Sequence, residues 1–228
     1  VFAKKVFKAP IYFWVQDLWP ESLKDAGGIN NKFVLGLFNS LTIWMYNHSR
    51  RVLIQSNGFK EYILKQGILN NKLIYYPNPT EEFYYPLTGI KEHSKFFKNK
   101  FFNIVFAGNI GEAQSFKTII DALALLKDLP VKIIVLGSGR YKETALDLIK
   151  QNGLESHFNF LGSFQPKEMP KFFSHADALL VSLKKSKIFS LTIPAKIQSY
   201  LACGKPIIAS LDGEGARIVE EAKCGVVS

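Results

Sequence analysis

The segment from Thr192 to Pro206 combines a loop, a helix and a short strand in an order that suits an anionic ligand. Thr192 can cap the predicted helix, and Pro194 fits its first turn because the N–H groups there have no intrahelical partner. Those N–H groups and the positive end of the helix dipole favour a bound phosphate, and Lys196 adds a full charge nearby. The segment therefore indicates a nucleotide-sugar site, with an ordinary capped helix of an α/β fold as the alternative.

Glycine-containing loops follow the predicted strands in the second half of the chain. In open α/β sheets ligands bind beyond the carboxyl ends of the strands, and glycine lets the backbone approach a ligand closely. Four of the five loops contain glycine near the strand end, which favours one shared ligand over a set of unrelated turns. The loops are Gly108-Asn109-Ile110-Gly111, Gly137-Ser138-Gly139-Arg140, Gly162-Ser163-Phe164, Ser182-Leu183-Lys184-Lys185 and Ser210-Leu211-Asp212-Gly213-Glu214-Gly215.

Other common chemistries lack their motifs. Gly137-Ser138-Gly139 lacks the third glycine of a dinucleotide fingerprint, and no acidic residue ends the next strand, so a nicotinamide enzyme is disfavoured. There is no Walker lysine loop, no Ser/His/Asp order and no carboxylate cluster that resembles a metal site. Cys203 and Cys224 have no metal-ligand spacing, which predicts two reduced thiols in a cytosolic protein and no structural zinc.

Charge is concentrated in the first half of this 228-residue chain, whose net charge is +10. Residues 1–100 carry 14 Lys/Arg against 7 Asp/Glu, which favours an anionic partner such as a phosphorylated substrate, an acidic lipid surface or nucleic acid. Solvated surface lysines are the alternative, and only residues 93–102 interleave basic and aromatic residues as a nucleic-acid binder would. The most apolar window, 33–46, is shorter than the ~20 residues of a membrane-spanning helix. Because the chain does not begin with Met, we expect it to be a fragment.

Strand-like and helix-like segments alternate along the chain, which predicts an α/β fold with two Rossmann-like domains and parallel sheets. We divide the chain into residues 1–88, a linker at 89–100 and residues 101–228, and expect the first domain to lack its opening strands. The predicted strands are 11–15, 51–55, 72–76, 102–107, 131–136, 158–161, 178–181 and 206–209. The predicted helices are 32–48, 58–66, 116–127, 142–152, 166–175 and 194–204, and residues 16–22 are predicted to be a loop.

Taken together, these motifs resemble the second domain of the family-4 (group 1) retaining glycosyltransferases of GT-B fold. That family has Gly-Arg-x4-Lys-Gly in the first loop, Gly-x-Gly after the second strand, Gly after the third, and Glu-x7-Glu before Ala-x-Gly-Lys-Pro. The matching segments here are Gly108–Ser115, Gly137–Gly139, Phe160–Gly162 and Ala202–Pro206, and in the first half Asp17–Ser22 and Tyr76–Pro79 are similar to features of the acceptor domain.

The chain departs from the family pattern at four positions. Asn109 and Gln114 stand in place of the pyrophosphate-binding arginine and lysine, and Leu191 and Ser199 in place of the two glutamates. One explanation is that Lys184, Lys185, Lys187 and Lys196 supply the positive charge; the other is a degenerate, inactive copy. Such variants, with Pro-x-Lys before Tyr-Leu-Ala, are similar to amino-sugar transferases of bacterial O-antigen and capsule assembly.

The resemblance implies a hexosyltransferase in bacterial surface polysaccharide biosynthesis. It would move a sugar, an N-acetylated amino sugar, from a UDP-sugar to a lipid-linked or saccharide acceptor with retention at the anomeric carbon. No cofactor and no metal are implied where helix N-termini and lysines stabilise the departing diphosphate. The alternative is a catalytically degenerate GT-B copy that acts as a sugar-nucleotide-binding or scaffold protein.

The resemblance also implies roles for single residues. Residues 1–88 would belong to the acceptor domain, in which Asp17 orients the acceptor hydroxyl, or else caps the turn before Trp19. Residues 101–228 would form the donor domain, where Lys196 and the 108–111 loop hold the diphosphate and Glu214, on a 213–215 loop, contacts ribose or sugar hydroxyls. The catalytic candidates are Asp17 and Lys196, and the donor-binding candidates are Gly108, Asn109, Gly111, Gln114, Gly137, Ser138, Gly139, Arg140, Ser163, Phe164, Lys187, Thr192, Ile193, Pro194, Lys196 and Glu214. The four histidines, His48, His93, His157 and His175, are expected to be surface residues.

Acceptors of such enzymes are sugars on a polyprenyl diphosphate, which implies a cytoplasmic protein that is peripheral at the inner face of the bacterial inner membrane. Cations and aromatic residues of the first half suit an anionic lipid surface, namely Lys4, Lys5, Lys8, Phe33, Phe38, Trp44, Phe96 and Phe97. The row Phe33, Leu37, Leu41 and Trp44 recurs at helical spacing, and we expect it to face the protein core rather than lipid.

Overall fold

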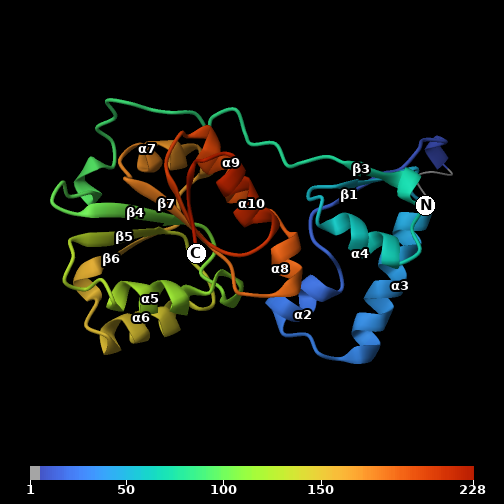
Figure 1. Cartoon of the computed structure of the whole chain (residues 1–228), viewed down its shortest axis with the longest axis horizontal. Helices are drawn as coiled ribbons and strands as arrows, with labels where there is room; N and C mark the ends of the chain where they lie inside the picture. The colour runs from blue at the N-terminus through green and yellow to red at the C-terminus, as the bar shows by residue number, and fades with distance from the viewer. Residues whose placement is uncertain (1–5) are drawn as a thin grey trace. The chain divides into compact units, whose positions relative to one another are not determined.

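The computed structural model describes residues 6–228, which form two compact units (Figure 1). Unit 1 contains the residues up to Asn78 together with 185–193 and 213–215, and unit 2 contains 79–184, 194–212 and 216–228. Each unit has its own parallel sheet, so the predicted α/β class is confirmed. This grouping by contacts does not test the functional ranges 1–88, 89–100 and 101–228, which stay predictions.

Unit 1 is built on a three-stranded sheet in the order β1-β2-β3, formed by Tyr12–Val15, Arg51–Ile54 and Leu73–Tyr75. Its core is completed by fully buried side chains such as Phe59 and Ile63. The helices with contacts in this unit are α2 (Glu21–Gly27), α3 (Lys32–His48), α4 (Phe59–Lys65) and α8 (Lys187–Leu191).

Helix α3 has the predicted bounds because its start is set by a local cap. The Asn31 side chain accepts the backbone N–H groups of Phe33 and Val34 at 3.0 and 3.2 Å. The expectation for its apolar row is wrong, however. Phe33, Leu37, Leu41 and Trp44 are 82%, 64%, 46% and 45% exposed, and α3 packs within unit 1 through the opposite face, which carries Thr42 and Tyr46.

Unit 2 contains a six-stranded parallel sheet in the order β6-β5-β4-β7-β8-β9. The chain therefore builds outward from β4 in one direction and then restarts at β7 in the other. Ligands of open α/β sheets bind at such a topological switch point, beyond the carboxyl ends of the strands. The strands are β4 (Phe102–Ala107), β5 (Val131–Leu136), β6 (Phe158–Gly162), β7 (Ala178–Ser182), β8 (Ile207–Ser210) and β9 (Gly225–Val227).

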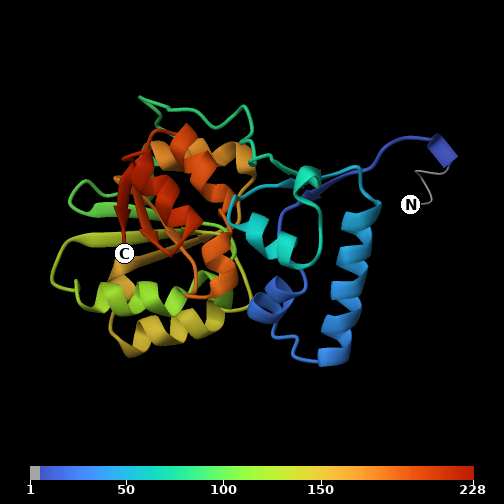
Figure 2. The same ribbon diagram turned by 45° about the vertical axis from the view of Figure 1, so that its right-hand side comes forward.

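Helices cover both faces of this sheet (Figure 2). Helices α5 (Phe116–Ala124) and α6 (Lys142–Gln151) lie side by side on one face, and α7 (Met169–Ser174) and α9 (Ala195–Ala202) cover the other. Two buried apolar clusters, one on each face, hold these layers together. A further helix, α10, spans Glu214–Glu221.

Several predicted boundaries are corrected by local backbone chemistry. The helix predicted over 116–127 ends at Ala124, where the last turn tightens and the N–H groups of Leu125 and Leu126 bond three residues back. The helix predicted over 166–175 is a 3-10 turn, Pro166–Glu168, followed by α7, because Pro170 has no N–H to continue a longer helix. The predicted loop 16–22 ends earlier, since α2 begins at Glu21.

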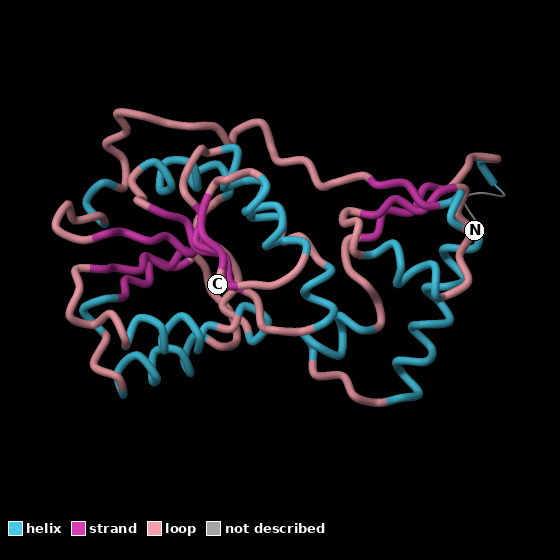
Figure 3. Tube along the Cα trace, in the orientation of Figure 1, coloured by secondary structure: helices cyan, strands magenta, loops and turns pink. Residues whose placement is uncertain are grey.

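The connection from β3 to β4 is irregular along most of its length, with one 3-10 turn at Ser94–Phe96 (Figure 3). From Pro79 onward it belongs to unit 2. Thr80 Oγ1 lies 3.2 Å from Ser199 Oγ of α9, and a Cβ added to Gly204, which follows α9, would lie 3.4 Å from the ring of Pro86. The connection is thus packed along the helix that carries Lys196.

Candidate functional site

The loops that follow β4 and β5 pack backbone against backbone at the switch point of unit 2. Gly137 has a φ of +147°, and an added Cβ would collide with the carbonyl oxygen of Gly108. A Cβ on Gly139 would likewise collide with the carbonyl oxygen of Ile110, whose N–H donates to Ser138 at 2.9 Å. Only glycine fits at 137 and 139, and this close packing fixes the two loops relative to each other.

Lys196 of α9 places its ammonium beside these loops. Its Nζ lies 4.4 Å from the centre of the buried Phe106 ring, and a Cβ on Gly108 would lie 3.0 Å from the same atom. Burial lowers the pKa of Lys196 to about 8. Over residues 6–228 no carboxylate pairs with this amine, so a desolvated cation stands where an anionic ligand would compensate it.

Tyr200 anchors the helix that carries this lysine. Its hydroxyl accepts the N–H of Ala107 at 3.3 Å and donates to the carbonyl oxygen of Leu180 at 3.4 Å. The pairing of β4 with β7 ends one residue earlier, at Phe106, so the hydroxyl bridges the two strands where they part. Lys196 and Tyr200 are four residues apart and share one face of α9, which ties the position of the amine to the sheet.

The predicted cap of α9 is wrong. Pro194 itself is the N-cap residue of the helix, without a side-chain hydrogen bond, while the Thr192 hydroxyl, at the C-cap of α8, donates to the carbonyl oxygen of Ile188 at 3.1 Å. A proline at this position leaves the first turn of α9 without a capping side chain. Thr192 and the buried Ile193 belong by their contacts to unit 1, and Pro194 begins the return to unit 2.

The two amides that replace the family's arginine and lysine face each other. Asn109 Nδ2 donates to Gln114 Oε1 at 3.5 Å, and a Cβ on Gly111 would lie 2.7 Å from the former atom and 2.9 Å from the latter. The loop therefore holds a neutral pair rather than two cations. Lys196 places its amine beside Gly108. Two further cations of unit 2 lie near the same loop: the exposed Arg140 follows Gly139, and the N–H of Lys184 donates to the Ala113 carbonyl oxygen at 2.8 Å.

The other donor-binding candidates of unit 2 differ in their surroundings. Ser138 and Arg140, after β5, and Ser163, after β6, are exposed at the strand ends. The Phe164 ring packs instead into an aromatic cluster, with its centre 4.6 Å from that of Phe172 and 5.9 Å from that of His93. The roles of these residues in donor binding stay predictions.

Four donor-binding candidates, Lys187, Thr192, Ile193 and Glu214, group with unit 1. Lys187 is exposed in the first turn of α8. The expected 213–215 loop is wrong, because α10 begins at Glu214. Within unit 1 the Glu214 side chain lies against Gly58, where an added Cβ would meet Glu214 Cγ at 3.0 Å.

Asp17 lies at a cavity of about 210 Å³ within unit 1. Burial raises the pKa of this carboxyl group, although the side chain keeps contact with solvent. Burial is the one cause of this pKa shift among the described residues and no hydrogen bond to the carboxylate contributes, which counts against the capping alternative. Rings with a nearby carboxylate can hold a hydroxylated ligand. The lining residues are Phe13, Trp14, Val15, Gln16, Asp17, Trp19, Thr42, Met45 and Tyr46.

The family model described as glycosyl transferases group 1 matches residues 90–228, more than half of the chain. The chain belongs to this family. It is 30% identical over 102 residues to a protein of Escherichia coli (strain K12) named as a colanic acid biosynthesis glycosyl transferase, WcaI. That alignment covers 44% of the chain and 24% of WcaI.

Solved structures share the fold of this group 1 glycosyltransferase chain. Anabaena Alr3699/HepE in complex with UDP and glucose matches with a TM-score of 0.80 and 16% identity, over 99% of the chain and 59% of HepE. WaaG, a glycosyltransferase involved in lipopolysaccharide biosynthesis, matches with a TM-score of 0.69 and 14% identity, over 96% of the chain and 62% of WaaG. These matches show the GT-B class of α/β fold, and the chain spans less than two thirds of each relative.

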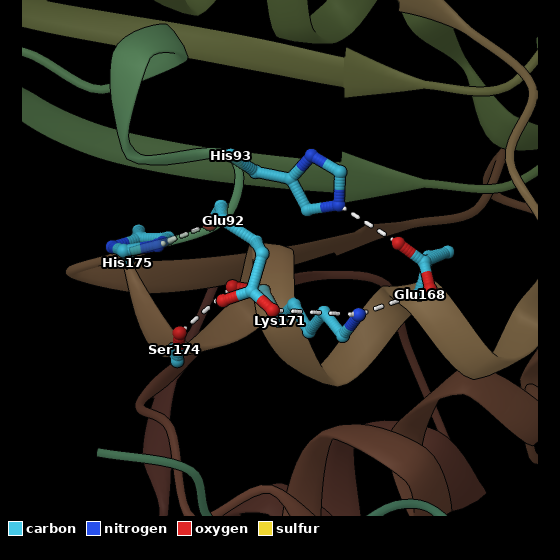
Figure 4. A network of polar contacts seen from close by, with 6 residues as sticks. All are labelled: Glu92, His93, Glu168, Lys171, Ser174 and His175. Atoms are coloured by element: carbon cyan, nitrogen blue, oxygen red, sulfur yellow. Dashed lines mark hydrogen bonds and ion pairs between the residues drawn. The ribbon is translucent and has the colours of Figure 1, made fainter. Parts of the chain in front are cut away.

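A polar network that the sequence did not reveal ties the β3–β4 connection of this glycosyltransferase chain to α7 (Figure 4). His93 Nε2 lies 3.0 Å from Glu168 Oε2, and its ring stacks on Phe172 with centres 3.9 Å apart. Lys171 lies 3.3 Å from Glu168 and 3.9 Å from Glu92. The expectation of surface histidines is therefore wrong for His93, and also for the buried His157, whose Nδ1 lies 2.9 Å from the Val131 carbonyl oxygen.

Within residues 6–228, no group of three or more His, Cys, Asp or Glu side chains is placed to hold a metal ion. No helix in that range combines the length and the apolar character needed to span a bilayer. Lys4 and Lys5, which were expected to suit a lipid surface, lie outside the described residues. Cys203 and Cys224 are both free cysteines.

Proposed function

We propose that the protein transfers a sugar, an N-acetylated amino sugar, from a UDP-sugar to a lipid-linked or saccharide acceptor with retention, in the assembly of a bacterial surface polysaccharide such as O-antigen or capsule. The observation that carries the proposal is the half-buried Lys196, whose ammonium lies beside the backbone loops at the switch point with no carboxylate partner among residues 6–228. The family supports the reaction class. HepE structures with UDP and with UDP-glucose support the donor, and WcaI and WaaG support the pathway.

On the donor side, Lys196 and the N–H groups of the glycine loops stabilise the departing diphosphate. At neutral pH an amine with a pKa of about 8 is mostly protonated, and a bound anion raises that pKa further. Fixed donors aimed at developing charge in a water-poor site act without reorganising during the step. The neutral Asn109–Gln114 pair adds hydrogen-bonding capacity without charge, so we assign the positive charge that stabilises the diphosphate to Lys196.

On the acceptor side, Asp17 accepts a hydrogen bond from the hydroxyl that attacks the anomeric carbon. Burial raises its carboxyl pKa, which makes the carboxylate a better hydrogen-bond acceptor than a fully solvated one. The rings that line its cavity suit the apolar face of a sugar. No metal or cofactor is proposed for the reaction.

The first test is a calorimetric titration with UDP, GDP and dTDP in the absence of metal. We expect micromolar affinity for UDP and a loss of at least tenfold in Lys196→Met. Lys117→Met is the matched control, because Lys117 is exposed and pairs with Asp121 at 2.6 Å on the surface of α5. Equal affinity in wild type and Lys196→Met would remove Lys196 from the site.

Turnover separates an enzyme from a binding protein. With UDP-sugar and acceptor, Lys196→Met should lower the rate of UDP release by about 10²–10³-fold, the usual cost of losing one donor to transition-state charge. A wild-type protein that binds UDP-sugar but never releases UDP would instead be the sugar-nucleotide-binding or scaffold copy.

The same proposal places the protein in the cytoplasm, peripheral at the inner face of the bacterial inner membrane. A lipid-linked acceptor sits at such a surface, and a net charge of +10 suits anionic headgroups.

A further inference from the structure

Unit 1 includes two short segments from the second half of the chain. They are residues 185–193, which contain α8, and residues 213–215, where α10 begins. Ile188 of α8 is 8% exposed and belongs to the buried core of unit 1. The same two segments carry Lys187 and Glu214, which are predicted to bind the donor. The positions of these two side chains therefore depend on the residues of the first half that pack around the segments.

The Ser186 hydroxyl joins the start of α8 to α2. Its oxygen accepts the backbone N–H groups of Ile188 and Phe189 at 3.1 and 3.4 Å, and its hydrogen is donated to Asp25 Oδ2. A hydroxyl has a single hydrogen, so the two N–H groups and the carboxylate together fix its orientation. A carboxylate acceptor also makes this hydrogen bond stronger than one between neutral groups. Asp25 thus holds the first turn of α8, which begins with Lys187, against α2 (Figure 1).

Gly58 makes a second contact with these segments. A Cβ on Gly58 would lie 3.0 Å from the Cα and the carbonyl oxygen of Leu191, at the end of α8, and 3.0 Å from Glu214 Cγ. Gly58 has a φ of −58° and a ψ of −25°, which any residue adopts, so its backbone conformation does not require glycine. The absence of a Cβ instead allows the close approach. Gly58 therefore lets Leu191 and Glu214 pack against the start of α4.

We propose that Asp25 and Gly58 are positioning residues for the sugar-nucleotide donor. Neither contacts the donor: Asp25 acts through Ser186 on Lys187, and Gly58 acts through its close approach to Glu214. This deepens the proposed function, on which it rests for the choice of a UDP-sugar as the ligand. Residues of the first half thereby set the affinity for the donor.

A positioning role differs from a purely structural one in what happens when the positioned side chain is absent. If Asp25 acts through Lys187, its removal costs no further affinity once Lys187 has been replaced. If Asp25 only stabilises unit 1, its removal weakens binding by the same factor with or without Lys187. Double-mutant cycles measure this difference directly.

A calorimetric titration with UDP and with UDP-N-acetylglucosamine tests the role of Asp25. We expect Asp25→Ala to raise the Kd about five- to tenfold, and Asp25→Asn to stay within about twofold of wild type, because its amide oxygen still accepts the Ser186 hydrogen. In the Lys187→Met background, Asp25→Ala should not raise the Kd further. Asp121→Ala is the matched control, since it removes only the exposed pair with Lys117 on α5 and should bind like wild type.

Gly58→Ala tests the second contact separately. The added methyl group forces the Leu191 backbone and Glu214 away from α4, so the Kd for UDP-N-acetylglucosamine should rise about threefold or more. In the Glu214→Ala background, Gly58→Ala should not raise the Kd further. Gly36→Ala in α3 is the matched control, because nothing lies within 4 Å of the added Cβ.

An unchanged Kd in Asp25→Ala, or an equal loss with and without Lys187, would overturn the role of Asp25. The same two results for Gly58→Ala and Glu214 would overturn the role of Gly58. Ser186→Ala breaks the same hydrogen bond from the other side, and it takes the place of Asp25→Ala if that variant does not fold. A wild-type protein that binds neither probe would overturn the proposed function itself, whereas wild-type binding that the variants leave unchanged counts against the positioning roles alone.

Discussion

Helices α3 and α5 carry similar apolar rows and place them in opposite surroundings. On α5, Phe116, Ile119, Ile120 and Leu123 are at most 5% exposed. On α3, Phe33, Leu37, Leu41 and Trp44 are at least 45% exposed. Both rows follow the helical period. The period therefore reveals that a face is apolar, but the rest of the fold decides what covers it.

The difference lies in the opposite face of each helix. The polar face of α5 carries the surface ion pair of Lys117 with Asp121, so only its apolar face can pack on the sheet of unit 2. Helix α3 has a second face suited to burial, where Tyr46 packs with the core of unit 1. Because that face packs against the core, the more apolar row stays exposed to solvent.

The largest expected effect is a difference in stability between variants of the α5 row and variants of the α3 row. Phe116→Ala should lower the free energy of unfolding by about 3–5 kcal/mol, because it opens a cavity at a side chain that is 1% exposed. Phe33→Ala, the same change at 82% exposure, should alter it by no more than about 0.5 kcal/mol. Urea denaturation of both variants measures the contrast, and comparable losses would mean that the α3 row is covered in solution.

The comparison extends from apolar side chains to cations. Lys196 is desolvated and has no carboxylate partner within residues 6–228, so Lys196→Met should raise the free energy of unfolding at pH 7 by about 1–3 kcal/mol. Lys32→Met, on exposed α3, should leave it within about 0.5 kcal/mol. A stabilised variant that has lost UDP affinity would show that the charge is kept for a ligand rather than for the fold.

The direction in which stability changes with pH follows from the direction of the Lys196 pKa shift. The pKa of Lys196 falls from 10.5 to about 8 on folding, so the unfolded chain binds this proton more tightly. The penalty is complete below pH 8 and is relieved as the pH rises toward 10.5. Wild-type stability should therefore gain over this interval relative to Lys196→Met, and parallel pH profiles for the two proteins would contradict the burial of the charge.

Elements with strong local signals were predictable from sequence. The bounds of α3, β4 and β5 match the predicted ranges, because an Asn31 cap and runs of β-branched residues act over a few neighbours. Helices α2, α8 and α10 and strand β9 were missed, since each is at most 8 residues long. One signal for α8 was available: the Ser186 side chain accepts the N–H groups of Ile188 and Phe189 as a cap.

The candidate site likewise contains features that local sequence predicts and features that it does not. The glycine loops and Lys196 can be read from local sequence. The Phe106 ring beneath the amine and the Tyr200 hydroxyl between Ala107 and Leu180 cannot, because they depend on the order of strands in the sheet. Contacts between residues that are far apart in the sequence could therefore not be predicted from the sequence alone.

The smallest effect concerns an intermediate case, the His93–Glu168 pair, whose side chains are 19% and 36% exposed. The hydrogen bond from His93, followed by that from Lys171, lowers the pKa of the Glu168 carboxyl group below its usual 4.5. His93→Gln should move this pKa back toward the usual value, and Lys171→Gln should move it less; a carboxyl-resolved NMR titration measures both.

The same pair should also affect stability. A lowered carboxyl pKa stabilises the fold above pH 4.5, and this gain is lost as the pH falls through the folded-state value. His93→Gln should therefore differ from wild type in stability near neutrality and converge with it in acid. An unchanged Glu168 pKa in His93→Gln would mean that the ring is held by its stacking on Phe172 alone.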